Sequence, residues 1–270
     1  MNKNINYIFN TNKQINKSTK IEYWNIQEMS ITYKNIILMK YQSNAKKQKK
    51  EIEKYINENK LLDVCKSFEG QQIKLYVSFM DKNIKISNIN IVGSLLEDVF
   101  FSKFNEKISD FEIGNKQSSP DYYAMNKTFE FEQKVFISKP GFDIGNFTSY
   151  INQLCESNGV FRKIFKTKYL IFEYYIFEDY ITIKKFHYLN VFNLVSYDKK
   201  YPISMQVKKN IWYNIRTDSV NNWYSTEKTP KKFIENIIKC IKQCHHIDNK
   251  EDKINNIEIQ MKEISKKYTF

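Results

Sequence analysis

The segment Phe129–Phe136, FEFEQKVF, constrains the fold more than any other part of the chain because its residues alternate with a period of two. Side chains of a β-strand point to opposite faces in turn. As a strand, the segment places Glu130, Glu132 and Lys134 on one face. The other face carries Phe129, Phe131, Gln133 and Val135. The apolar face can be buried, whereas the charged face must meet water, a metal or a substrate.

A further carboxylate precedes this strand, in the pair Pro120-Asp121, which stands out because the chain has four prolines. We expect a short strand over Asp121–Met125 and a turn at Asn126-Lys127, which would lead directly into the Glu132 strand. Two acids and a lysine that converge on one point can hold a divalent cation and activate water against a phosphodiester. Asp121, Glu132 and Lys134 are therefore the candidate site.

The surrounding pattern predicts a mixed α/β fold with a mixed central β-sheet flanked by helices. Before the motif we expect an exposed charged helix over Ser43–Lys60, a hairpin around Asp81-Lys82-Asn83, and a helix that opens at Gly93. Ser94 would cap this helix and Glu97 would complete a capping box. After the motif we expect a structured loop over Ser138–Asn146, a helix from Asn146, a buried central strand over Lys168–Ile176, an alternating strand over Ile203–Arg216, and a packed helix after Pro230.

Length and composition bound the class of protein. The 270 residues can bury a large core, and the 16% of aromatic residues argues against disorder. No convincing linker divides the chain, so we expect a single domain over residues 1–270. No apolar run is long enough for a membrane helix, and the first residues lack the apolar stretch of a secretory signal. A cytoplasmic protein that does not bind membranes is the expectation.

The net charge of +13 suits a polyanionic partner such as DNA or RNA. A+T-rich coding would also produce a chain rich in Lys, Asn and Ile, so the charge adds little weight. The four cysteines are scattered, which favours reduced thiols. The cluster Cys240, Cys244, His245 and His246 could suggest zinc, but the apolar stripe through Cys240 and Cys244 favours a packed helix. His187 lies in an aromatic strand and is interpreted as a core or surface residue.

With these motifs in place, the chain resembles a type II restriction endonuclease of the PD-(D/E)xK nuclease superfamily. The resemblance rests on Pro120-Asp121, on Glu132-Gln133-Lys134, and on the preceding helix with Glu97. The segment PGFDIGNFTSYINQL and the late strand MQVKKNIWYNIR are also similar to such enzymes, so the nuclease core spans about residues 93–216. The second acid is Glu, an accepted variant, and Gln133 occupies a position that is often apolar.

The resemblance implies specific roles for the motif residues. Asp121, Glu132 and the backbone carbonyl of Gln133 would bind Mg²⁺, which prefers hard oxygen ligands. Lys134 would orient or activate the attacking water. Glu97 would hold a second ion or an outer-shell water, unless its role is that of a helix cap. Glu130 competes with Glu132 for the ligand role, but Glu132 stands next to Lys134 on the strand face and Glu130 one step further away.

Several residues of the late strand are candidates for DNA contacts. Arg and Lys can read guanine edges and Asn can pair with adenine, while either kind can contact phosphates instead. The candidates are Lys208, Lys209, Asn210, Asn214 and Arg216. Arg216 stands apart because a rare arginine in a lysine-rich chain suggests that its planar fork is needed.

The leading hypothesis is a Mg²⁺-dependent endonuclease that cuts double-stranded DNA at a short palindromic site. A palindrome implies a homodimer, and the enzyme would act in a restriction-modification system beside a DNA methyltransferase encoded nearby. A second hypothesis keeps the nuclease but assigns it to DNA repair, junction resolution or transposition. A third, from another class, is a basic DNA-binding protein without catalysis, whose binding would depend steeply on salt.

Overall fold

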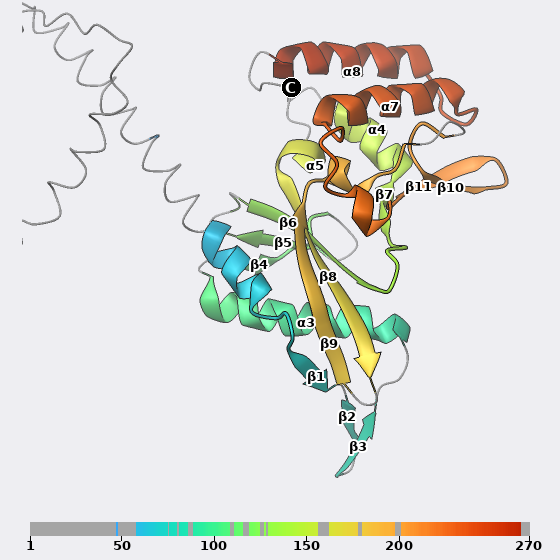
Figure 1. Ribbon diagram of the computed structural model, residues 1–270. Helices are drawn as coiled ribbons and strands as arrows, with labels where there is room; N and C mark the ends of the chain where they lie inside the picture. The colour runs from blue at the N-terminus through green and yellow to red at the C-terminus, as the bar shows by residue number, and fades with distance from the viewer. Residues whose placement is uncertain are drawn as a thin grey trace, which may run out of the picture. The chain divides into compact units, whose positions relative to one another are not determined.

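The computed structural model describes Lys47 and residues 58–265, apart from short gaps at 75, 80, 86–88, 109–110, 116–118, 125–126, 128, 156–161, 178–179 and 198–200. All named elements belong to the unit Lys54–Phe270 (Figure 1). The predicted helix over Ser43–Lys60 therefore lies mostly outside the described residues. Residues 58–66 are helical and lead to the first strand.

A mixed six-stranded sheet forms the centre of this unit, in the order β1-β9-β8-β6-β5-β4. Its strands are β1 (Gln72–Lys74), β4 (Glu112–Ile113), β5 (Tyr122–Ala124), β6 (Phe129–Ile137), β8 (Thr167–Phe177) and β9 (Tyr180–Leu189). β6 and β8 pair in parallel, and the other neighbours are antiparallel. The predicted mixed α/β fold is confirmed, as is the strand pair on which the motif lies.

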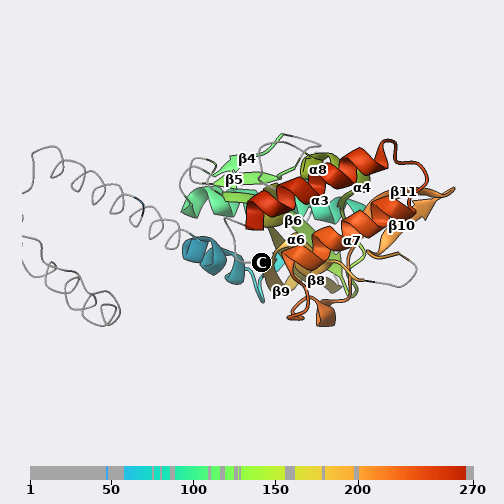
Figure 2. The same cartoon turned by 90° about the horizontal axis from the view of Figure 1, so that it is seen from above.

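The two faces of the sheet contribute to two hydrophobic cores. Tyr169 and Ile171 of β8 belong to one core, and Leu170 and Phe172 belong to the other, as the alternation of a strand requires. The first core, here called the upper core, is closed by α4 (Phe147–Cys155), α7 (Pro230–Gln243) and α8 (Lys250–Ser265). α7 and α8 run side by side over it (Figure 2). The second, the lower core, is closed by α3 (Ile89–Lys107).

The predicted N-terminus is wrong for α3 and nearly right for α7. α3 begins at Ile89, so Ser94 lies inside the helix and the predicted capping box of Ser94 and Glu97 is wrong. Isoleucine and asparagine residues before Gly93 continue the helix, although their alternation is also typical of a strand. The packed helix predicted after Pro230 is α7, which includes Pro230 as its first residue, and the Thr229 hydroxyl accepts a hydrogen bond from the Lys232 amide at 3.2 Å.

A small second sheet, in the order β10-β11-β7, corrects two predictions. The expected loop over Ser138–Asn146 ends in strand β7 (Asp143–Asn146). The expected single strand over Ile203–Arg216 is a hairpin of β10 (Met205–Lys208) and β11 (Ile211–Arg216). Lys209 and Asn210 form its two-residue turn with φ angles of 49° and 63°, and positive φ at both positions is typical of a type I′ turn.

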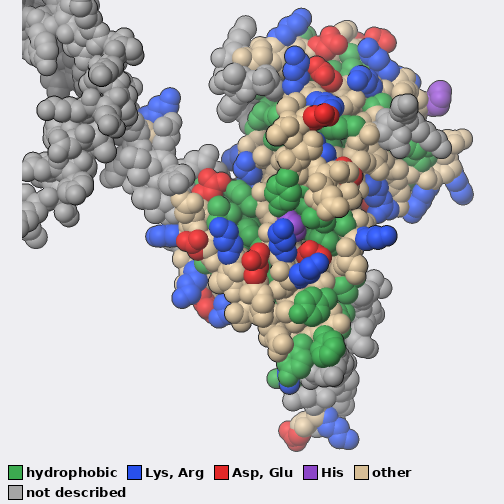
Figure 3. All heavy atoms as spheres, viewed as in Figure 1, with side chains coloured by type: hydrophobic (Ala, Val, Ile, Leu, Met, Phe, Trp, Pro, Cys, Tyr) green, Lys and Arg blue, Asp and Glu red, His purple; other side chains and the backbone are tan. Residues whose placement is uncertain are grey.

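The remaining elements are short. β2 (Tyr76–Phe79) and β3 (Lys82–Lys85) form the hairpin predicted around Asp81. α5 (Arg162–Phe165), α6 (Val191–Leu194) and the 3₁₀ helix Val220–Asn222 connect larger elements. Among the described residues, none of the helices has the length and apolar character required to cross a bilayer. Lysine and acidic side chains are interspersed on the face shown in Figure 3.

Candidate active site

The pairing of β5 with β6 positions the first acid of the motif. Asp121 directly precedes β5, and the antiparallel register that pairs Tyr122 with Phe131 brings Asp121 opposite Glu132. The backbone amide of Gln133 donates a hydrogen bond to Oδ2 of Asp121 at 2.7 Å. This bond fixes the carboxylate against the motif strand, so its direction depends on backbone geometry and not on a second side chain.

A close approach of two backbone segments holds Asp121 from the other side. The Gly114 amide donates to the Asp121 carbonyl at 2.7 Å. A Cβ atom at position 114 would overlap the carbonyl oxygen of Pro120. Glycine is therefore required here, because any side chain would displace the segment that carries the carboxylate.

Lys134 lies between the two acids. Its Nζ is 3.8 Å from Oδ2 of Asp121 and 3.5 Å from Oε2 of Glu132. The structure thus brings together the three side chains that the sequence selected. Glu132 is 8% exposed, Lys134 24% and Asp121 32%, so the cluster opens towards solvent on the Asp121 side.

Burial and mutual charge set the protonation of this cluster. The pKa of Asp121 is raised to about 6, because burial, with Glu132 and Glu97 adding to it, outweighs the opposing effect of Lys134 and the Gln133 amide. For Lys134, burial lowers the pKa, but the charges of Asp121, Glu132 and Glu97 outweigh it and the net pKa is raised. Lys134 is therefore an ammonium at neutral pH, and it partly neutralises the two carboxylates.

Glu130 shares the strand face of Glu132 but is engaged elsewhere. Its side chain is 1% exposed, and its Oε1 is 2.7 Å from Nζ of Lys166. The Thr167 hydroxyl donates to its Oε2 at 3.3 Å. The expectation that this whole charged face must meet water, a metal or a substrate is wrong for Glu130, because an ion pair with the neighbouring strand allows it to be buried.

Glu97 lies on α3 with its side chain exposed. The Tyr122 hydroxyl donates to the Glu97 backbone carbonyl at 3.2 Å, which ties α3 to β5 beside Asp121. Burial raises the pKa of Glu97, the nearby ammonium of Lys134 lowers it, and Asp98 and Glu132 raise it. Since Glu97 is not a helix cap, its charge is available to the cluster.

The donor set fits Mg²⁺ in its chemistry. Among the described residues, no group of three or more His, Cys, Asp or Glu side chains is placed so that it could hold a metal ion. Mg²⁺ does not require such a group, because it retains several waters and is usually held by one or two carboxylates together with substrate phosphates. Asp121 and Glu132 would supply two carboxylates, and the Gln133 backbone carbonyl would add a third hard oxygen ligand.

A buried tyrosine pair behind Glu132 was missed by sequence reasoning. Tyr169 is the register neighbour of Glu132 in the parallel pair β6–β8. Its hydroxyl donates to the Ile144 carbonyl at 3.2 Å and lies 3.1 Å from the Tyr150 hydroxyl. Burial raises the pKa of both hydroxyls, and the charge of Glu132 raises it further. Nothing in the local sequence distinguishes these tyrosines from other core aromatics.

The five candidate DNA contacts separate into two groups. Lys208, Lys209 and Asn210 are exposed at the end of the β10–β11 hairpin, which extends away from the sheet (Figure 1). Asn214 instead donates to Oδ2 of Asp143 at 2.9 Å. Arg216 Nη1 lies 3.0 Å from Oδ1 of Asp143 and donates to the Gly141 carbonyl at 3.0 Å. The guanidinium fork of Arg216 therefore holds β7 and its preceding loop.

The remaining titratable candidates are structural. Cys240 and Cys244 are fully buried on α7 and at its C-cap, which agrees with a packed helix. His187 is 1% exposed, and its Nδ1 lies 2.7 Å from the Tyr224 hydroxyl. Burial, with Lys185 adding to it, lowers the pKa of His187 to about 4.

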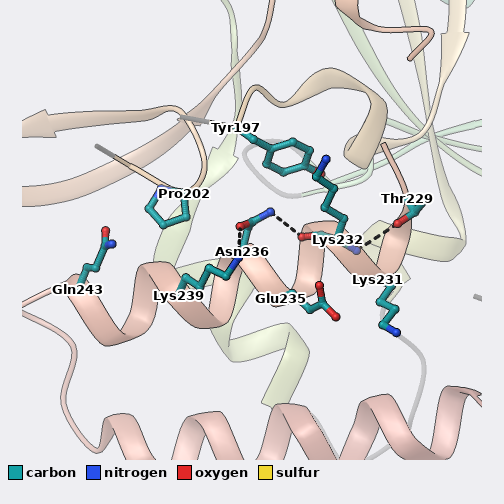
Figure 4. A pocket seen from close by; sticks show the side chains of 9 residues that line it. All are labelled: Tyr197, Pro202, Thr229, Lys231, Lys232, Glu235, Asn236, Lys239 and Gln243. Carbon is teal, nitrogen blue, oxygen red and sulfur yellow. Dashed lines mark hydrogen bonds between the residues drawn. The ribbon is translucent and has the colours of Figure 1, made fainter. Parts of the chain in front are cut away.

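A separate basic cleft of about 680 Å³ lies along α7. Figure 4 shows Lys232 beside the ring of Tyr197, with Asn236 bonded to the backbone of Lys232 one turn earlier. Lys231 and Lys239 also line this cleft. None of the motif residues does, so this cleft is separate from the cluster of Asp121, Glu132 and Lys134.

Comparison with known proteins supports the fold and identifies the family. No curated protein sequence matches the chain. The solved structure of the NlaIV restriction endonuclease is similar, with a TM-score of 0.65 and 22% identity over 79% of this chain and 89% of that one, which shows a shared fold. The sequence profile of the NgoBV restriction endonuclease family matches residues 44–269. The resemblance to restriction endonucleases is thereby confirmed, and the chain belongs to the NgoBV restriction endonuclease family.

Proposed function

We propose that this type II restriction endonuclease hydrolyses phosphodiester bonds of double-stranded DNA at a short palindromic site, with Mg²⁺ as cofactor and Asp121, Glu132 and Lys134 as the catalytic residues. The observation that carries the proposal is the position of Lys134 between the two carboxylates, at 3.8 Å from Asp121 and 3.5 Å from Glu132. A structural ion-pair network would not require a partly exposed acid whose pKa burial raises to about 6.

Asp121, Glu132 and the Gln133 carbonyl would hold Mg²⁺, which when bound lowers the pKa of water and offsets charge on the phosphate. The Gln133 amide keeps the Asp121 carboxylate in place. The Lys134 ammonium orients the attacking water and stabilises the negative charge that develops on the phosphoryl oxygens. Water adds to phosphorus as one P–O ester bond breaks, and the water loses a proton while the leaving oxygen gains one.

The wider biological setting follows from the same proposal. A two-fold symmetric homodimer binds the palindromic site, and each protomer cuts one strand. Glu97 holds a second ion or an outer-shell water beside the cluster. The exposed residues Lys208, Lys209 and Asn210 contact the DNA. The enzyme acts in the cytoplasm within a restriction-modification system, beside a methyltransferase that protects the host DNA.

The test is cleavage of unmethylated phage DNA by the purified protein with Mg²⁺. Discrete bands that disappear when EDTA is added support the proposal, and the fragment ends then define the site. A chain that binds this DNA but leaves it intact under every divalent ion would be a DNA-binding protein without catalysis, and the proposed chemistry would be wrong. Glu132→Gln is the matched control, since it must abolish the bands without abolishing binding.

A further inference from the structure

The ion pair of Glu130 and Lys166 is built into the sheet next to the catalytic cluster. Glu130 is 1% exposed, with one oxygen 2.7 Å from Lys166 Nζ and the other accepting from the Thr167 hydroxyl at 3.3 Å. Thr167 is the first residue of β8, and Lys166 directly precedes it. A buried carboxylate with a partner on each oxygen is held rigidly, and so is the ammonium that it binds.

The strand register places this pair one step from Glu132. Glu130 pairs with Thr167 and Glu132 with Tyr169, without a register shift between them. Two residues along a strand correspond to about 6.6 Å. Since Glu130 and Glu132 point to the same face, the Lys166 ammonium that Glu130 binds lies on the same face of the sheet as Glu132.

The carboxylates at this end of the sheet outnumber the ammonium groups, so a DNA strand needs additional cations in order to approach. Three carboxylates, those of Glu97, Asp121 and Glu132, interact here with one ammonium group, that of Lys134, and the ion pair of Glu130 with Lys166 adds no net charge. A phosphodiester is repelled by this excess of negative charge. The Lys166 side chain is 40% exposed, and an ammonium has three donors, so it can bind Glu130 and an incoming anion at the same time.

We propose that Lys166 is a positioning residue that contacts a DNA backbone phosphate next to the scissile one, and that buried Glu130 holds its ammonium in place. This inference rests on the proposed function, and it concerns how the substrate strand is aligned with the cluster. The pair also keeps Glu130 from competing with Glu132 for the metal, because both of its oxygens are occupied.

The experiment measures binding to a short DNA duplex in EDTA, so that cleavage does not interfere, over about 50 to 200 mM salt. Lys166→Met alone leaves a buried acid without its cation and can unfold the protein. The informative variant is therefore the double change Glu130→Gln with Lys166→Met, which removes both charges. We expect its salt slope to fall by about 0.9 and its affinity to fall roughly eightfold at about 0.1 M salt. Lys166→Arg should keep the wild-type slope.

The control is Lys103→Met, which removes a lysine from an exposed pair with Glu106 on α3 and should leave the slope unchanged. In cleavage assays the double variant should raise KM more than it lowers kcat. If the double variant binds with the wild-type slope, the pair is purely structural and the inference is wrong. A wild-type protein that never cuts DNA would refute the proposed function instead, and the salt slope would still decide whether Lys166 contacts phosphate.

Discussion

Replacing Gln133 by methionine should stabilise the protein without impairing catalysis. The Gln133 side chain is fully buried on the lower-core face of β6, where its register neighbour is Leu170. Neither its Oε1 nor its Nε2 has a hydrogen-bond partner in the described structure. Methionine has a similar length and no amide, so it fills the same space without a polar group that lacks a partner.

The expected gain follows from the two unpartnered amide groups. A buried donor or acceptor left without a partner costs about 1–3 kcal/mol. Taking the lower end for each of the two groups, we expect the free energy of unfolding to rise by about 2 kcal/mol. For a unit of this size, that corresponds to an increase in Tm of roughly 4–8 °C.

Urea denaturation, monitored by circular dichroism, measures this effect. We expect a higher midpoint urea concentration and an unchanged m-value. The matched control is Gln243→Met, an exposed glutamine at the end of α7, where we expect a change within about 0.5 kcal/mol. Cleavage should remain near wild type, because the backbone amide that binds Asp121 and the backbone carbonyl are both retained. An unchanged or lower midpoint would refute the reasoning and would show that a buried water satisfies the amide.

Three further predictions concern the site and its support. Glu132→Ala should lower kcat by roughly two orders of magnitude or more with DNA binding retained, whereas Glu130→Ala should keep a near-normal kcat. The opposite result in a cleavage assay with phage DNA would exchange their roles. Gly114→Ala should shift the Asp121 segment and slow cleavage by up to about a hundredfold, measured as kcat, and a normal kcat would show that the segment can adapt. Because the folded pKa of His187 is lowered to about 4, the unfolded state binds its proton first as the pH falls below about 6.5. The free energy of unfolding should therefore drop by about 2 kcal/mol between pH 7 and 5, and urea titrations of His187→Phe should lack this drop if the histidine is its source.

Local rules were sufficient for the motif strand and its surroundings. The period of two places Glu132 and Lys134 on one face whatever lies around them, and the antiparallel pairing of β5 with β6, which are neighbours in the chain, brings Asp121 opposite Glu132. Both consequences depend on contacts within about a dozen residues. The fold class could be predicted for the same reason, because the local periodicity of apolar residues distinguishes strands from helices.

Tertiary structure decided the features that depend on distant partners. Glu130 and Glu132 have the same local pattern, and the parallel pairing of β6 with β8 gives one of them a lysine and leaves the other to the cluster. Arg216 is bound by Asp143 because β7 lies next to β11. The start of α3 was misplaced because glycine and serine resemble a helix boundary, although packing against β6 extends the helix through them. Side-chain charge and periodicity are local properties, whereas the partner that satisfies a buried charge is chosen by the arrangement of the strands.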